Sequence, residues 1–344
     1  MYFIGVDHHK QVSVMTVLDE DGRELKNGRV FNLREKVERF LEGYRPFTAV
    51  IEAGRSSYVM ADLLRELGGE VKMANALQVK AIAHARIKTD KRDSRTLAQL
   101  LRADLIPEVY QRGTRNRRAQ RVVRMRAYWV VKQTEVKNKI HALLAQQKEE
   151  IRLEVEKRKD GLFSLRGIEF LKNLPLEDPE KMVMDDLIQG YLEVQAHLKR
   201  SNGLARMLYG EIEEAARIDT VPGFGMTLSV LVAVEIADVN RFSTVADLHS
   251  YAGVIPSTYA SGERTYHGRI TKQGSAWLRW AAVEAVYPAI KKDLGLRVLS
   301  SRLAKRKGAN VAKIAVARRL LTIIYRLLTE KREYISDMMT SSAA

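Results

Sequence analysis

The chain has 344 residues, a formal net charge of +16 and a hydrophobic content of 46%. This length allows two or three domains with at least one large core, and the charge predicts a polyanionic partner, with nucleic acid favoured over an anionic membrane. The longest apolar run, at 226–234, is too short to span a bilayer, so we expect no membrane partner. The absence of cysteine excludes disulfides and thiolate metal sites, and the N-terminus lacks the layout of a signal peptide, so we expect a cytoplasmic protein.

The first hundred residues alternate between short strand patterns and amphipathic helical patterns. Strands are expected at 2–6, 11–18, 23–31, 48–53 and 70–74, and helices at 33–44, at 58–67 and in most of the stretch to about 106. Ser56 or Ser57 is expected to cap the second helix. The order βββαβαβα is that of the ribonuclease-H-like fold, in which the first and fourth strands lie side by side at the centre of the sheet.

Four acidic residues would meet in this arrangement. Asp7 follows the first strand, Glu52 lies in the fourth, and Asp90 and Asp93 are three positions apart, on one face of a helix that begins there. Ionised carboxylates repel each other unless a cation joins them, and hard divalent ions prefer oxygen ligands. The spacing alone leaves two interpretations open, which are a metal site or a set of ion pairs with the basic residues of 88–95.

The histidines suggest a transition-metal site less strongly. None has the neighbours of a zinc site, and the adjacent His8 and His9 would point to opposite faces of a strand. We therefore expect no metal role for the candidates, which are His8, His9, His84, His249 and His267.

The segment 114–160 contains neither glycine nor proline, and it predicts a long helix. The residues expected to face inward are Val122, Met125, Trp129, Val136, Ile140 and Leu143. The glycine and proline residues of 161–180 predict a bend, and 181–217 returns as helix. In this second helix, the inward positions are Leu187, Tyr191, Leu198, Leu208 and Ile212. The pair would be a coiled coil or an extended antiparallel helix pair, serving as an interdomain strut or a dimerisation arm.

The region from Ile218 onward opens with a tight turn, Pro222-Gly-Phe-Gly225, before an apolar helix. The turn is similar to a helix-hairpin-helix element, in which Gly223 and Gly225 would leave backbone N–H groups open to a phosphate. A plain helix–helix turn is the alternative. A loop is expected at 253–274, followed by helices to about residue 336.

Basic residues concentrate in two acid-poor blocks. Residues 112–126 carry seven arginines and no acid, and residues 264–326 carry 15 lysines and arginines against two acids. Such blocks fit salt-dependent contacts with backbone phosphates, although solvated helix faces are the common alternative. The candidates for nucleic-acid contact are Arg115, Arg117, Arg118, Arg121, Arg264, Arg269, Lys272, Lys305, Arg306 and Lys307.

Both halves of the chain resemble one family. The segments GVDHHK, VIEA and KTDKRDS resemble the Asp-Glu-Asp-Asp motif of the RuvC-like domain in DEDD insertion-sequence transposases. The second half, with VPGFG, SVLVAVEI, YAGVIP and GRITK, is similar to the C-terminal transposase domain of the same family. This is the insertion sequence 110 family, which includes the Piv-type DNA invertases. His8-His9 and Ser94 depart mildly from its pattern.

The resemblance implies an α/β RuvC-like (ribonuclease-H-like) domain at 1–112, a helical coiled-coil arm at 113–217, and a mainly helical transposase domain at 218–344. It implies Mg²⁺, replaceable by Mn²⁺, at Asp7, Glu52, Asp90 and Asp93. It also implies that Ser261, in the SG sequence, attacks the scissile phosphate and becomes covalently linked to DNA. Ser257 and Ser275 are the local competitors for this role.

The resemblance further implies partners and an assembly. The partners would be double-stranded DNA of the element ends and the target, and a structured noncoding guide RNA. A homodimer or homotetramer is expected, in which the acids of one subunit complete the serine site of another, in the bacterial or archaeal nucleoid. The alternatives are a site-specific DNA invertase, a RuvC-like metal-dependent junction nuclease with a structural Ser261, and a catalytically silent nucleic-acid-binding protein.

Overall fold

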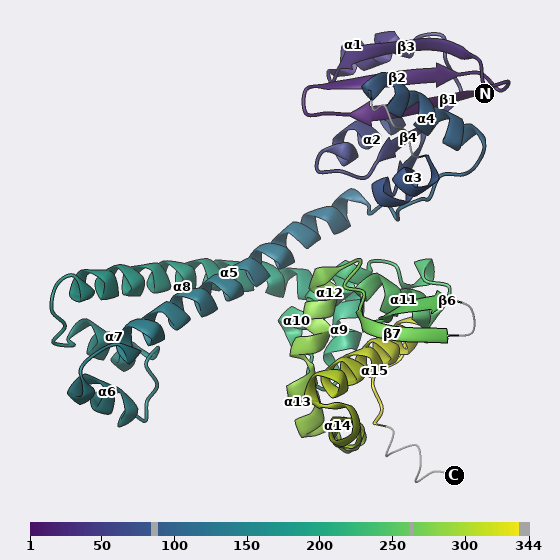
Figure 1. Cartoon of the computed structure of the whole chain (residues 1–344). Coiled ribbons are helices and arrows are strands. Elements are labelled where there is room, and N and C mark those ends of the chain that lie inside the picture. The colour runs from purple at the N-terminus through teal and green to yellow at the C-terminus, as the bar shows by residue number, and fades with distance from the viewer. Residues whose placement is uncertain (84–88, 262–263, 337–344) are drawn as a thin grey trace, which may run out of the picture. The chain divides into compact units, whose positions relative to one another are not determined.

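The computed structural model describes residues 1–83, 89–261 and 264–336, without the side chains of 258–267 (Figure 1). The chain divides into two compact units, Met1–Gln111 and Arg112–Ala344, which we call the N-terminal unit and the C-terminal unit. Their boundary lies one residue from the predicted end of the first domain, whereas the predicted division at 217 stays a prediction. Within the described part of the chain, we find no helix with the length and apolar character needed to cross a bilayer.

The N-terminal unit is built on a five-stranded sheet with the strand order β3-β2-β1-β4-β5. Its strands are β1 (Tyr2–His8), β2 (Val12–Leu18), β3 (Glu24–Phe31), β4 (Phe47–Glu52) and β5 (Glu70–Ala74). The first three strands are antiparallel, whereas β1 pairs with β4, and β4 with β5, in parallel. The predicted contact between the first and fourth strands is therefore confirmed.

Helices cover both faces of this sheet. Alternate residues of each strand point to opposite faces, and apolar residues on both faces are buried. The helices are α1 (Arg34–Phe40), α2 (Ser57–Glu66), α3 (Ala76–Ile82) and α4 (Asp90–Arg102). Ile4, Val6 and Ile51 pack in one apolar cluster with residues of α1 and α2. Val50 packs on the other face, in a second cluster with residues of α3 and α4, among them Leu97.

The C-terminal unit contains a pair of long helices that meet in a small core of their own (Figure 1). The elements of this arm are α5 (Thr114–Ala145), α6 (Glu149–Glu156), α7 (Leu165–Lys172) and α8 (Glu180–Glu211). The predicted helical segment 114–160 is interrupted, because α5 ends at Ala145 and α6 begins at Glu149. The predicted bend at 161–180 was incomplete, since it contains α7.

The buried side of α5 differs from the prediction. Met125 is 52% exposed, whereas Ala119, Val123 and Ala127 are buried at four-residue spacing. Small side chains line this part of the helix pair, and among the six predicted positions Met125 alone is exposed, whereas Val136 and Leu143 pack against the core of the arm. Ile140 is buried as predicted.

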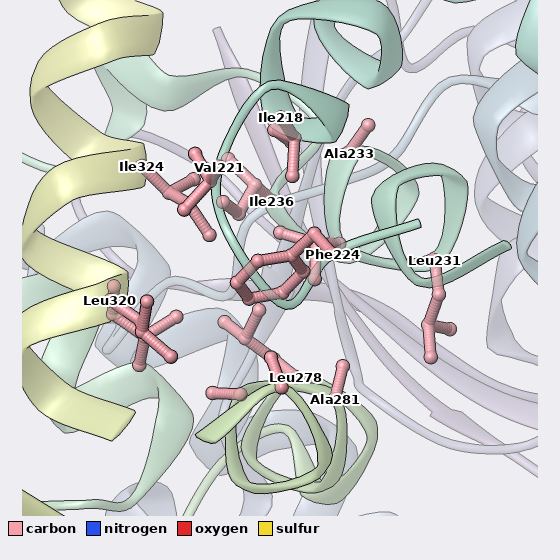
Figure 2. Close-up of a cluster of buried hydrophobic side chains, with 14 of the residues drawn as sticks. Ile218, Val221, Phe224, Leu231, Ala233, Ile236, Leu278, Ala281, Leu320 and Ile324 are labelled. Carbon is pink, nitrogen blue, oxygen red and sulfur yellow. The ribbon is translucent and has the colours of Figure 1, made fainter. Parts of the chain in front are cut away.

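The remaining elements pack around an apolar helix, α10, whose residues from Ser229 to Ile236 are all buried. They are α9 (Glu213–Asp219), α10 (Met226–Ile236), η1 (Val239–Arg241), α11 (Val245–Ala252), β6 (Pro256–Ser261), β7 (Arg264–Ile270), α12 (Ala276–Glu284), α13 (Val286–Lys292), α14 (Leu294–Lys307) and α15 (Ala309–Thr329). Figure 2 shows Phe224 in the middle of this core, above Leu278 and Ala281.

The segment predicted as a loop at 253–274 contains an antiparallel hairpin, β6–β7. Its glycines and polar residues suggested a loop, but the β-branched and aromatic residues of both strands favour an extended pairing. The loop prediction was therefore wrong for this segment.

Candidate metal centre and serine hairpin

The sheet places Asp7 and Glu52 at the same end of neighbouring strands. β1 and β4 run parallel, and their last paired residues are Val6 and Ile51. The next position along each strand is Asp7 and Glu52, so the same register sets the two acids side by side. The side chain of Asp7 is 21% exposed.

Helix α4 brings the second pair of acids to this edge. Thr89 is its N-cap and accepts a hydrogen bond from the Arg92 N–H at 3.3 Å, so that Asp90 and Asp93 fall in the first turn. The helix N-terminus favours negative charge in this turn. Local sequence therefore explains where the helix starts, and packing must explain where it lies.

The packing of α4 on β1 depends on Gly5. A Cβ atom on this residue would lie 1.9 Å from the carbonyl oxygen of Ser94 and 2.5 Å from the backbone nitrogen of Ala98. Only glycine permits so close an approach of helix to strand. The Ser94 hydroxyl lies 2.9 Å from the Thr16 hydroxyl of β2, and both side chains are buried. Ser94, a departure from the family pattern, thus ties α4 to the sheet.

His9, which follows β1 directly, completes the cluster. Its Nε2 atom lies 3.4 Å from Asp7 Oδ2 and 3.4 Å from Asp90 Oδ2. One ligand atom from each of these residues lies within 4.8 Å of the others. Among the residues that the structure describes, Glu52 and Asp93 fall outside this close group. The sequence analysis expected no metal role for His9, although its spacing of two residues from Asp7 would place both on one side of an extended chain.

His8 belongs to a separate network on the opposite side. Its Nδ1 lies 2.9 Å from the Ser13 hydroxyl and its Nε2 lies 3.0 Å from the Ser56 hydroxyl. Burial is the main factor that lowers the pKa of His8, and the neighbouring His9 lowers it further. Ser56 stands at the N-cap of α2 without a capping hydrogen bond from its side chain, and Ser57 bonds to Gly54 instead. Ser56 therefore occupies the predicted N-cap position, but neither serine side chain makes the capping hydrogen bond.

Asn32 extends the network to the backbone of His9. The Ser13 hydroxyl donates to Asn32 Oδ1 at 2.7 Å, and Asn32 Nδ2 donates to the carbonyl oxygen of His9 at 2.8 Å. The Ser13 hydroxyl has only one proton, so it accepts from His8 Nδ1. This chain of hydrogen bonds fixes the backbone from which His9 reaches the acids.

The close group fits a divalent ion. Two ligand atoms bound at about 2.1 Å lie roughly 3.0 Å apart when adjacent in an octahedron and about 3.4 Å apart in a tetrahedron. The separations of 3.4 Å between His9 and each carboxylate equal the tetrahedral value and exceed the octahedral value by about 0.4 Å, so an octahedral ion would draw the three atoms closer together. The carboxylates suit a hard cation, and the imidazole suits a first-row transition metal.

Ser261 lies on the hairpin of the C-terminal unit. It is the last residue of β6 and pairs with Arg264, the first residue of β7. The side chains of both lie outside the described residues. The base of the hairpin is closed by backbone hydrogen bonds from Thr271 to Ile255 and from Lys272 to Gly253, at 2.9 and 3.1 Å. The hairpin therefore presents Ser261 at the end remote from this base.

The two competing serines have other surroundings. Ser275 is the N-cap of α12 and accepts from the backbone N–H of Leu278 at 3.1 Å. Its hydroxyl donates to Glu235 at 3.0 Å, and it is buried. The hydroxyl oxygen of Ser257 would lie 2.4 Å from a Cβ atom on Gly268 of the facing strand. Ser275 thus has a structural role, and Ser257 packs against the partner strand.

Glu235 forms a buried centre that the sequence analysis did not single out. It is 0% exposed, and the Arg124 guanidinium donates to both of its carboxylate oxygens at 2.7 and 3.1 Å. Gln120 and Ser275 donate to it as well. Arg112 lies 3.9 Å from the carboxylate and donates to the Tyr251 hydroxyl at 2.6 Å. These contacts join α5 to α10, α11 and α12, so we call the group the Glu235 hub.

The arginines of 112–126 therefore divide into two groups. Arg112, Arg124 and Arg126 bond within the unit, the last to Asn202 at 2.9 Å. Among the candidates for nucleic-acid contact, Arg117 is half-buried and donates to the Arg112 carbonyl, whereas three others are exposed at three-residue spacing. These three are Arg115, which also pairs with Glu211, Arg118 and Arg121.

The other basic candidates lie on the surface. Arg269 and Lys272 are exposed at the hairpin, and Lys305, Arg306 and Lys307 are exposed in the last turn of α14. Cations in a last helical turn also stabilise the helix dipole, so these three residues have a structural reason as well.

The turn at 222–225 supports the plain helix–helix interpretation for one glycine. Gly223 has φ +94°, and a Cβ atom there would lie 2.2 Å from the Ala285 carbonyl oxygen. This glycine is required by packing and by its left-handed conformation. Gly225 is exposed at the N-cap of α10, and its phosphate contact stays a prediction.

Known families match both units. The family model described as Transposase IS116/IS110/IS902 family matches residues 215–298, and the DEDD_Tnp_IS110 transposase model matches residues 4–148. The chain belongs to the IS110 family of transposases. The DEDD match contains Asp7, Glu52, Asp90 and Asp93, and the other match contains the Ser261 hairpin. The family implies an enzyme that processes DNA and suggests a divalent metal.

Relatives of this transposase are similar over nearly their full length. A probable family 20 transposase of Pseudomonas aeruginosa is 25% identical, over 96% of this chain and 94% of its own. The transposase for insertion sequence element IS1111A of Coxiella burnetii is 22% identical, over 96% and 90%. That for IS1328 of Yersinia enterocolitica is 23% identical, over 95% and 96%.

Proposed function

We propose that this transposase cleaves and rejoins DNA strands of a mobile element by using a metal-binding acid site and a serine nucleophile. The observation that carries the proposal is the convergence at one sheet edge. Parallel pairing aligns Asp7 with Glu52, and close packing at Gly5 brings Asp90 to the same edge. This arrangement supports a ribonuclease-H-like catalytic site.

In the proposed reaction, Ser261 Oγ forms a bond to the scissile phosphorus while the bond from phosphorus to a deoxyribose oxygen breaks. The serine hydroxyl loses its proton, and the departing oxygen gains one, so the strand becomes a phosphodiester of the protein. A metal ion would polarise the phosphate and assist the serine, which is a weak nucleophile at its ordinary pKa. Reversal of the step on a different strand end gives strand exchange without an external energy source.

The acids and the basic residues have separate parts in this proposal. Asp7, Glu52, Asp90 and Asp93 would hold Mg²⁺ or Mn²⁺. Exposed guanidinium and ammonium groups would bind backbone phosphates of double-stranded DNA and of a noncoding guide RNA. These groups are Arg115, Arg118, Arg121, Arg269, Lys272, Lys305, Arg306 and Lys307. A homodimer or homotetramer would bring two element ends together.

The test is a search for a covalent protein–DNA adduct. Labelled element-end DNA is incubated with Mg²⁺, the cognate RNA and full-length protein, and the products are separated on a denaturing gel. The wild type and the Ser257→Ala control are expected to give an adduct, whereas Ser261→Ala and Asp90→Ala give none. Nicked DNA that persists with Ser261→Ala would sink the serine mechanism and leave a metal-dependent nuclease.

A further inference from the structure

We infer that His9 is a ligand of the divalent ion and that it shifts the preference of the site from Mg²⁺ toward Mn²⁺. This inference rests on the proposed function, because it takes Asp7 and Asp90 as ligands of the same ion. It adds a nitrogen ligand to a site that the family motif describes by acids alone.

The first argument is geometric. His9 Nε2 lies at equal distances of 3.4 Å from Asp7 Oδ2 and Asp90 Oδ2, so it faces the space between the two acids. These separations are about 0.4 Å longer than those of adjacent atoms that share one octahedral ion with bonds of about 2.1 Å. An ion could reach the three atoms from solvent, because the side chains of Asp7, His9 and Asp90 are 21%, 49% and 60% exposed.

The second argument is preorganisation. The His9 backbone is held at both polar groups, since its N–H donates to the Val12 carbonyl at 3.0 Å and its carbonyl accepts from Asn32 Nδ2 at 2.8 Å. The Asn32 amide is held in turn by Ser13. A ligand whose backbone is fixed loses less entropy when it binds an ion, and such supporting contacts usually matter for metal affinity.

The third argument concerns the choice of metal. Mg²⁺ binds oxygen ligands almost exclusively and gives up water reluctantly. Mn²⁺ also suits carboxylates and is the weakest binder in the first-row order, but as a transition ion it accepts an imidazole nitrogen more readily than Mg²⁺ does. One imidazole added to two carboxylates therefore stabilises bound Mn²⁺ more than bound Mg²⁺.

A different role for His9 predicts the opposite result. If the ring only bridged the two carboxylates, it would compete with the metal for them. Its removal would then raise the affinity for both ions, whereas removal of a ligand lowers the affinity for Mn²⁺. The sign of the change separates the two roles.

The experiment uses full-length protein at one fixed pH, with Mn²⁺ binding followed by electron paramagnetic resonance and Mg²⁺ binding by competition. We expect His9→Ala to lower Mn²⁺ affinity about tenfold, the lower end of the range for groups that support a metal site, and Mg²⁺ affinity by much less. We expect His9→Asp to retain binding while favouring Mg²⁺ over Mn²⁺. The exposed His141, in the C-terminal unit, gives the matched control His141→Ala.

Pulsed resonance supplies a direct readout. Bound Mn²⁺ should show ¹⁴N coupling from an imidazole in the wild type and in His141→Ala, and the coupling should vanish in His9→Ala. Circular dichroism of the metal-free variants shows whether they are folded.

Two outcomes would overturn the inference. The first is that the wild type binds Mn²⁺ without ¹⁴N coupling. The second is that His9→Ala raises the affinity for Mn²⁺. Failure of the proposed function looks different. If Ser261 is not the nucleophile, nicked DNA persists with Ser261→Ala while the ¹⁴N coupling stays, and if the acids hold no ion, Asp7→Asn leaves Mn²⁺ binding unchanged.

Discussion

Two groups of carboxylates, one in each unit, differ in their surroundings. Glu235 is completely buried and receives hydrogen bonds from Arg124, Gln120 and Ser275. Asp7 and Asp90 are 21% and 60% exposed at a sheet edge, and a histidine lies against both. A carboxylate enclosed by guanidinium and hydroxyl donors has no capacity left for a ligand. Acids that converge at an open edge retain access to an ion, so the difference distinguishes a structural site from a binding site.

The largest expected effect tests the structural side of this comparison. Glu235→Ala should destabilise the C-terminal unit by about 3–5 kcal/mol, because Arg112 and Arg124 lose the anion that they enclose. Urea denaturation followed by circular dichroism measures this loss. Asp90→Asn, the matched change at the open edge, should alter stability by less than about 1 kcal/mol while it abolishes Mn²⁺ binding. Equal losses of stability in the two variants would remove the distinction between the sites.

The next effect concerns the contact that brings α4 to the acids. Gly5→Ala places a methyl group 1.9 Å from the Ser94 carbonyl oxygen, so α4 must move. We expect a loss of about 1–3 kcal/mol and a weaker affinity for Mn²⁺. Gly190→Ala is the control, because no atom lies within 4 Å of that Cβ position in α8, and it should stabilise by roughly 0.5–1 kcal/mol. Unchanged Mn²⁺ affinity in Gly5→Ala would show that the helix position does not govern the site.

A third acid, Asp293, lies between the two extremes. It caps α14 and accepts from the Tyr334 hydroxyl at 2.6 Å and from the Ser336 hydroxyl at 2.9 Å. Burial opposes ionisation, but the hydrogen bonds from Tyr334, the Leu296 N–H, Ser336 and the Gly295 N–H outweigh it and lower the pKa of Asp293.

Tyr334→Phe should therefore cost about 1 kcal/mol at pH 7. A lowered carboxylate pKa contributes stability above its unfolded value of about 3.9, and this contribution is lost as the pH falls through the folded value. The difference between wild type and variant should shrink toward pH 3 in urea titrations. A difference independent of pH would assign the effect to packing alone.

The smallest effect concerns buried histidine. His249 bonds to the Arg318 carbonyl and the Thr322 hydroxyl, and burial, followed by the charge of Arg318, lowers the pKa of its imidazole. The unfolded chain then binds more protons as the pH falls below about 6.5, so stability decreases from pH 7.5 to 5.5. His249→Gln should flatten this slope in part, since His8 contributes with the same sign. A slope that stays the same in His249→Gln would contradict this assignment.

The sequence predicted the sheet well because its strands are short, apolar and separated by clear turns. The parallel alignment of Asp7 with Glu52 followed from the order of the elements, and the common face of Asp90 and Asp93 followed from their spacing of three residues at a helix start. The contact of His9 with the acids was not predicted, because strand alternation was applied to His8 and His9 alone. The same alternation places Asp7 and His9 on one side of the chain. Local pattern gives the face of a residue, but not which helix will lie over that face.

The C-terminal unit was harder to predict, since its determinants are long-range. Glu235 stands in an unbroken apolar run, and its partners Arg112, Arg124 and Ser275 are 40 or more residues away in the chain. The arginines of 112–126 form one basic block in the sequence, but in the structure some bond within the unit and others are exposed. Whether an arginine faces solvent or a buried acid depends on these long-range contacts, and the composition of the segment does not predict them.

The Glu235 hub also has a mechanical consequence. Helices α5 and α8 each have 32 residues, so each is about 48 Å long at 1.5 Å per residue. Arg112 and Arg124 attach the beginning of α5 to the hub, whereas the far end has only its own small core. The arm is therefore anchored near Glu235 at one end. A rotation of α5 by about 5° at that end would displace its other end by roughly 4 Å. The Glu235 hub and the apolar packing of Ala119 and Val123 therefore together determine how accurately the distant tip is positioned.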